Sequence, residues 1–170
     1  MLRVVNNPTL FQKAKEQVYN DYPDRSSFEP NGDGRRFVRH CDIDDNIVKE
    51  AFAAFGINSF LSEPRLGNFI GNNYLDGACV HKHKDNAPDG YQHVRCNFAL
   101  EMPKYGGNPL LDDKEIEIKE GDIWICFASL EYHATTPIKG GERLILSCGS
   151  LVESELVQKI YNELKSIEKV

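Results

Sequence analysis

The sequence predicts a mainly β fold, a sandwich or barrel with flanking helices packed on one side. Two observations carry this prediction. Over residues 66–151 the apolar residues recur at a spacing of two and in short runs, which is typical of strands. Turn signals built from glycine, proline and aspartate separate these runs. Because the chain has 170 residues, we expect one domain over residues 1–170.

Three helices are expected beside the β region. Residues 8–20 begin with a proline and place apolar residues at helical spacing. Residues 44–55 begin with two aspartates and are followed by a glycine, the usual stop signal. Residues 152–167 form an amphipathic pattern. The expected parts of the chain are a helical N-terminal support, a β core and a C-terminal helix, at residues 1–60, 66–151 and 152–168.

Short β runs and tight turns alternate along the rest of the chain. Sharp turns are indicated at Asp76-Gly77 and Gly106-Gly107, among others. The expected strands span residues 35–41, 68–74, 77–84, 92–102, 108–111, 114–118, 122–128, 130–135 and 142–151.

Composition limits the classes of function. The net charge of -6 disfavours a non-specific nucleic-acid binder, which usually presents a basic face. No apolar run approaches the roughly 20 residues that span a bilayer. The apolar stretch at the start is too short for a signal peptide. We therefore expect a cytoplasmic protein with no membrane partner.

Histidine and aspartate residues predict a metal site. His83 and Asp85 are two residues apart, so on a strand both side chains project from the same face. A third ligand must come from another strand, and His133 is the histidine of the downstream β region. Two imidazoles and one carboxylate leave positions open on ferrous iron. His81 shares the same face and is a rival ligand, although only His83 completes a His-x-Asp pair.

A second site is predicted around Arg143. This residue lies inside an apolar strand, where a buried charge needs a partner. Glu142 projects to the other face, so an incoming carboxylate would supply the partner, and arginine suits bidentate contact with carboxylates. Ser147 lies on the same face and could donate to the same group. We expect a carboxylate-binding site beside the metal.

The order of these residues resembles that of the Fe(II)/2-oxoglutarate dioxygenases. A His-x-Asp pair is followed about fifty residues later by His133, and Arg143 lies ten positions further on. Tyr74 begins a Tyr-x-x-Gly-x-x-x-x-x-His-x-Asp frame that resembles the prolyl 4-hydroxylases. Asn72-x-Tyr74 resembles the Asn-x-Tyr of the AlkB-type demethylases. The resemblance covers roughly residues 70–150, nearly half the chain.

The resemblance implies a double-stranded β-helix core, the jelly roll shared with the cupins, and a 2-oxoglutarate-dependent hydroxylase. Implied cofactors are Fe(II), the cosubstrate 2-oxoglutarate and O2, with ascorbate as a possible addition. The implied iron ligands are His83, Asp85 and His133. The implied 2-oxoglutarate residues are Arg143, Tyr74, Ser147 and Asn72.

The expected substrate is a peptidyl proline or an amino-acid-like molecule, hydroxylated at an unactivated C–H bond with release of succinate and CO2. Loops at residues 29–40 and 85–93 are candidate lids. The sequence does not indicate an oligomeric state. Two alternatives stay open. One is a cupin-type metal-binding protein without oxygenase activity that uses His81, His83 and His133. The other is an AlkB-like nucleic-acid base dioxygenase.

Overall fold

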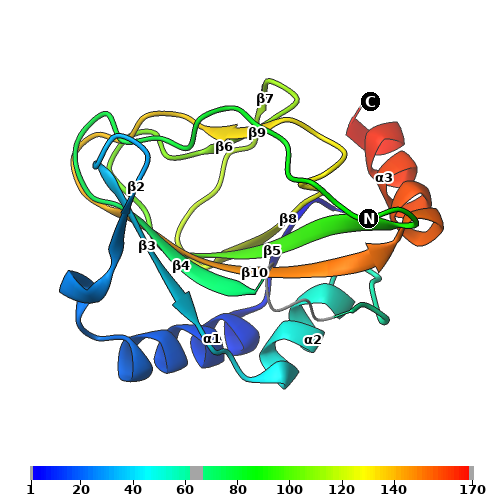
Figure 1. Ribbon diagram of the computed structural model, residues 1–170, viewed down its shortest axis with the longest axis horizontal. Coiled ribbons are helices and arrows are strands. Elements are labelled where there is room, and N and C mark those ends of the chain that lie inside the picture. Colours follow the sequence, from blue (N-terminus) through cyan, green and yellow to red (C-terminus); the bar gives the residue numbers. More distant parts are fainter. Residues whose placement is uncertain (1, 62–66, 169–170) are drawn as a thin grey trace.

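A seven-stranded antiparallel sheet forms the centre of the fold in a computed structural model that describes residues 2–61 and 67–168 (Figure 1). The sheet pairs segments that are far apart in the sequence, because β10 lies between β5 and β4. In spatial order its strands are β1 (Val4–Asn6), β8 (Asp122–Cys126), β5 (Tyr91–Glu101), β10 (Arg143–Glu153), β4 (Asn68–Asn73), β3 (Arg36–Cys41) and β2 (Glu29–Asn31).

A small sheet lies over one face of the large sheet, on the side opposite the helices α1 and α2 (Figure 1). Its strands are, in spatial order, β7 (Lys114–Glu115), β6 (Pro109–Leu111) and β9 (His133–Thr135). Two antiparallel sheets that face each other, with helices outside, form a jelly-roll core. The prediction of a mainly β fold with flanking helices is confirmed.

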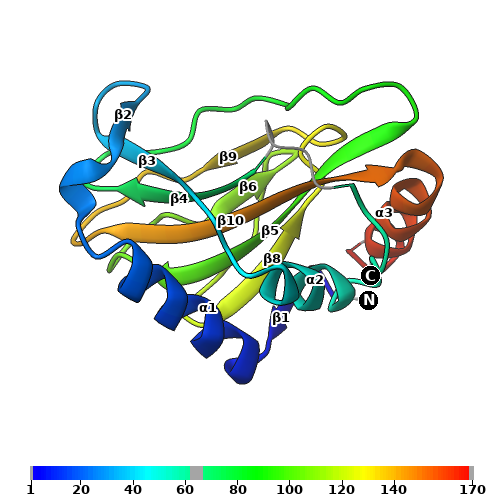
Figure 2. The ribbon, with the colours of Figure 1, turned by 60° about the horizontal axis from the view of Figure 1, so that its bottom comes forward.

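Two helices cover the other face of the large sheet, and a third lies at its end (Figure 2). They are α1 (Pro8–Asp21), α2 (Asp45–Ala53) and α3 (Ser154–Glu168), with a single 3-10 turn, η1 (Arg25–Ser27), after α1. Asn7 and Asp44 cap α1 and α2, each accepting a hydrogen bond from a backbone N–H of the first turn. The three expected helices are confirmed. None of the described helices is long and apolar enough to cross a membrane.

The N-terminal part of the chain does more than the expected helical support. It contributes β1, β2 and β3 to the large sheet, and neither β1 nor β2 was expected from the sequence. Strands β1 and β2 have only three residues each, which is too few for an alternating pattern to be recognised. The N-terminal segment therefore builds both edges of the sheet.

The strand expected at residues 77–84 is wrong. This segment forms no regular strand and meets β9 only at scattered points, including one isolated bridge between His83 and His133. The two residues exchange backbone hydrogen bonds of 3.1 and 2.9 Å, and the N–H of Asp85 donates to the carbonyl of Ala128 at 2.8 Å. Few backbone hydrogen bonds join the two segments, so no continuous ladder forms. The segment is nevertheless fixed in place beside β9.

The two faces of the large sheet differ in character. Along β10, Leu144, Leu146 and Cys148 pack into the main apolar core with the helices. The alternate residues Arg143 and Ser147 face the space between the two sheets, where they line a cavity. The period of two thus separates a core side from a cavity side on the same strand.

Candidate active site

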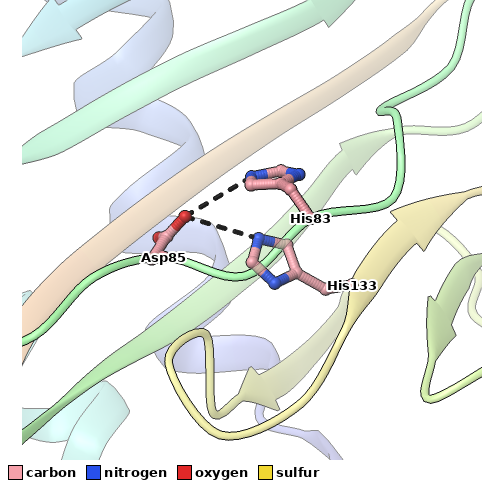
Figure 3. A group of neighbouring side chains, drawn as sticks. All are labelled: His83, Asp85 and His133. Atoms are coloured by element: carbon pink, nitrogen blue, oxygen red, sulfur yellow. Dashed lines mark ion pairs between the residues drawn. The ribbon is translucent and has the colours of Figure 1, made fainter.

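Two histidines and one aspartate meet between the sheets (Figure 3). His83 and Asp85 come from the irregular segment before β5, and His133 comes from β9. The Nε2 atoms of His83 and His133 lie 3.4 and 3.7 Å from Oδ1 of Asp85. One ligand atom from each residue lies within 4.8 Å of the others, which is a donor set that fits one metal ion. The structure thus brings together the three residues that the sequence predicts as iron ligands.

The other carboxylate oxygen of Asp85, Oδ2, lies close to two side chains of β5. Nδ1 of the buried His93 lies 2.8 Å from Oδ2, and Nε of Arg95 lies 3.6 Å from the same oxygen. Burial raises the pKa of Asp85, but the contact with His93 and the charges of Arg95 and His133 outweigh it and lower the pKa to about 2. Asp85 is therefore a carboxylate at neutral pH, with Oδ1 directed to the two histidines.

Both histidines present Nε2 because Nδ1 is engaged elsewhere. Nδ1 of His83 lies 2.7 Å from the carbonyl oxygen of His81, and Nδ1 of His133 lies 3.4 Å from that of Glu131. Such contacts fix the ring orientation of metal-binding histidines. Burial and the nearby His83 lower the pKa of His133, which favours the neutral imidazole that binds metals. His81 lines the same cavity but is not part of the three-residue group.

A buried ion pair supports the backbone next to His133. Glu131 has no exposed surface, and its carboxylate accepts hydrogen bonds from Arg3 at 2.8 Å and from the N–H of Phe127 at 3.0 Å. Arg3 itself is 6% exposed. The start of the chain is thereby connected to the turn that leads into β9.

The cavity between the sheets has a volume of about 410 Å3, and the three metal-site residues lie on its wall together with Arg143. Arg143 is 5% exposed, and within residues 2–61 and 67–168 no carboxylate forms an ion pair with it. Burial, together with the charge of Arg36, lowers the pKa of Arg143 to about 9. Its Nε donates to the carbonyl of Gly107 at 2.7 Å. A side chain at Gly107 would meet Cδ of Arg143 at 2.9 Å, so the glycine leaves room for the arginine.

Ser147 lines the cavity as the sequence predicts, and two further arginines line it that the sequence did not single out as site residues. Arg95 on β5 donates to Oγ of Ser147 at 3.3 Å. Arg36 on β3 extends over Gly71, where a side chain would meet its guanidinium at 3.2 Å. The sequence signal for Arg36 is weak, because it lies in a segment with several exposed charges. The pairing of β3 with β4 is what brings it inward.

Asn72 and Tyr74 lie away from the cavity. Asn72 faces the helix side of β4 and donates to Glu142 at 3.3 Å. Tyr74 follows the end of β4, is 53% exposed and packs edge-on against Phe37. This placement gives no support to their predicted role in binding 2-oxoglutarate. The alternation of side chains along β4 explains this placement. Phe69 and Gly71 face the cavity, and their even-numbered neighbours face the helices.

Structural likenesses to this chain are found among oxygenases. No protein-family model matches the chain, and no curated protein matches it. A prolyl-4-hydroxylase from Pseudomonas putida superimposes with a TM-score of 0.62 at 17% identity, covering 88% of this chain and 91% of that one. A prolyl hydroxylase from Trichoplax adhaerens, solved with a hypoxia inducible factor peptide fragment, gives a TM-score of 0.61 at 15% identity and covers 89% and 83% of the two chains.

A third solved structure is an oxidoreductase of the 2OG-Fe(II) oxygenase family from Burkholderia pseudomallei. It gives a TM-score of 0.60 at 12% identity and covers 87% of this chain and 82% of its own. Such identities establish the fold and leave activity to be argued from the site. The chain has the jelly-roll fold of the prolyl 4-hydroxylase-like 2OG-Fe(II) oxygenases.

Proposed function

We propose that this protein is an Fe(II)- and 2-oxoglutarate-dependent oxygenase that hydroxylates an unactivated C–H bond. The observation that carries the proposal is one cavity that holds both a metal donor set and a buried arginine without a carboxylate partner among the described residues. Either feature alone also occurs in proteins of quite different activity. Together, they match what a metal and a dicarboxylate require.

The donor set fits ferrous iron. His83 and His133 would bind through Nε2 and Asp85 through Oδ1, since their other polar atoms are engaged. Three protein ligands leave coordination positions open for a chelating keto acid and for oxygen. When bound, iron and 2-oxoglutarate supply the oxidising chemistry, with release of succinate and CO2.

Arg143 and Ser147 are the proposed partners of the far carboxylate of 2-oxoglutarate. Arg143 is fixed by the Gly107 carbonyl and lies with its guanidinium 5.8 Å from the ring centre of Trp124. A carboxylate that enters this buried end of the cavity would neutralise the charge of Arg143 and gain charge-assisted hydrogen bonds. Its orientation would direct the keto-acid end toward His83, Asp85 and His133.

The chemical class of substrate is a peptide or a small amino-acid-like molecule, with peptidyl proline as the first candidate. The structural likeness to a prolyl hydroxylase solved with a peptide supports this choice. The cavity volume of about 410 Å3 leaves room for a small group beside 2-oxoglutarate.

The test is succinate formation by the purified protein supplied with Fe(II), 2-oxoglutarate and oxygen, with peptide, amino-acid and oligonucleotide pools screened for a gain of one oxygen. We expect slow succinate release without substrate. The variants His83→Ala and Arg143→Met should each reduce it at least about a hundredfold. His40→Ala and Arg39→Gln, at exposed positions on β3, should retain it. Turnover that survives both site changes would refute the assignment.

A further inference from the structure

Arg36 and Arg95 form a second basic group in the cavity, beside Arg143. Both guanidinium groups lie against the ring of Phe69, with their central carbons 5.8 Å and 4.7 Å from the ring centre. Arg36 comes from β3 and Arg95 from β5, so two strands on opposite sides of β4 and β10 direct a cation to the same point. All three residues line the cavity.

The placement of Arg36 is costly in the absence of a ligand. Burial and the charge of Arg95 lower the pKa of Arg36 to about 10, and burial lowers the pKa of Arg95. Arg36 donates to the side chain of Asn31 at 2.7 Å, but its buried Nε has no hydrogen-bond partner among the described residues. A partly buried guanidinium group whose Nε is unsatisfied is a binding group for an anion.

The charges of the cavity wall do not balance. Three arginines line it against two carboxylates, Asp85 and the half-exposed Asp33, which leaves the wall with one net positive charge. Ferrous iron and 2-oxoglutarate carry equal and opposite charges, so loading both leaves the wall as cationic as before. One positive charge therefore remains for the substrate.

We propose that the substrate carries a carboxylate that binds between Arg36 and Arg95, beside Phe69. The inference rests on the proposed function, whose cosubstrate occupies Arg143. A single remaining charge favours a carboxylate over a phosphate ester, which carries close to two. Arg95 also contacts Asp85 at 3.6 Å, so a carboxylate held there lies near the metal-site residues. The substrate class is thus a small carboxylic acid or a peptide with an acidic residue next to the oxidised carbon.

The first test measures binding without turnover. The protein is loaded with Mn(II) and saturating 2-oxoglutarate, and its melting temperature is followed against propionate, propionamide and chloride at matched ionic strength. We expect propionate alone to raise the melting temperature. The rise should be absent in Arg36→Gln and present in Arg39→Gln, which removes the same charge from an exposed site on the same strand.

The second test measures selectivity during turnover. The common amino acids and N-acetyl amino acids are supplied with Fe(II) and 2-oxoglutarate, each as the free acid and as the carboxamide. Acids should stimulate succinate release more than their amides do, and Arg36→Gln should raise KM for the best acid by about ten- to a hundredfold. Arg36→Lys should restore part of that loss.

Two outcomes would overturn the inference. One is a melting temperature that responds to propionate equally in the native protein and in Arg36→Gln, or in neither. The other is equal stimulation by acids and amides. Failure of the proposed function looks different, because 2-oxoglutarate itself would then not shift the melting temperature of the native protein. Propionate binding that depends on Arg36 could still be seen in that case.

Discussion

The helix side and the cavity side of the large sheet are built from the same strands with opposite chemistry. On β5, Cys96, Phe98 and Leu100 point into the apolar core, whereas Arg95 and Asn97 line the cavity. The helix side buries continuous apolar surface and supplies most of the driving force for folding. The cavity side instead holds the buried cation of Arg143, which opposes folding until a ligand arrives. Along each strand, therefore, one residue contributes to the apolar core and the next one lines the cavity.

The largest expected difference between the two sides is in the free energy of unfolding that a substitution removes. Phe98→Ala should reduce the free energy of unfolding by about 3–5 kcal/mol, because Phe98 has no exposed surface and a cavity would remain in the core. Asn97→Ala, one residue earlier, should change it by less than about 1 kcal/mol. Denaturant unfolding followed by circular dichroism measures both. Equal losses would mean that the cavity side is also a structural core.

An intermediate effect is expected at the support of Arg143. Gly107 has a φ of +79°, and a Cβ there would press on Arg143 and Pro103. Gly107→Ala should lower stability by about 1–3 kcal/mol and weaken 2-oxoglutarate binding by about tenfold. Calorimetric titration of the Mn(II) protein measures that affinity.

Gly90→Ala is the matched control for this change. Gly90 has a similar φ of +83°, but no atom lies within 4 Å of a Cβ built there. It should share the backbone strain and keep the affinity. If both variants bound 2-oxoglutarate as the native protein does, the contact between Gly107 and Arg143 would be irrelevant to binding.

The smallest effect separates the predicted cosubstrate residues by face. Ser147→Ala, on the cavity side, should weaken 2-oxoglutarate binding by about two- to fivefold through loss of one hydrogen bond. Tyr74→Phe, at the exposed end of β4, should leave the affinity within about twofold of the native value. A larger loss of affinity in Tyr74→Phe would mean that Tyr74 contributes to 2-oxoglutarate binding.

Local spacing was enough to predict much of the site. The metal residues depend on a His-x-Asp pair and one later histidine, and Arg143 and Ser147 depend on alternation in a long apolar strand. In such a strand the apolar neighbours reveal which face is buried against the core. The helices were predicted for the same reason, since their apolar residues recur over several turns.

The remaining features depend on pairing between distant strands. Asn72 and Tyr74 were named from a resemblance in sequence order, and the run from Phe69 to Tyr74 mixes apolar, small and polar residues without the alternation that would indicate a face. The contact of His93 with Asp85 crosses a loop, and the approach of Arg36 to Phe69 requires β3 to pair with β4. No local spacing encodes either contact.

The ion pair between Arg3 and Glu131 bears on how the protein can be handled. Glu131 lies two residues before His133 and is wholly buried, so removal of the first few residues would leave a carboxylate without its cationic partner at the turn into β9. Trimming of the amino terminus, by a protease or by design, would then disturb the position of His133 from a distance. An affinity tag is better attached away from the amino terminus, so that β1 and Arg3 keep their positions.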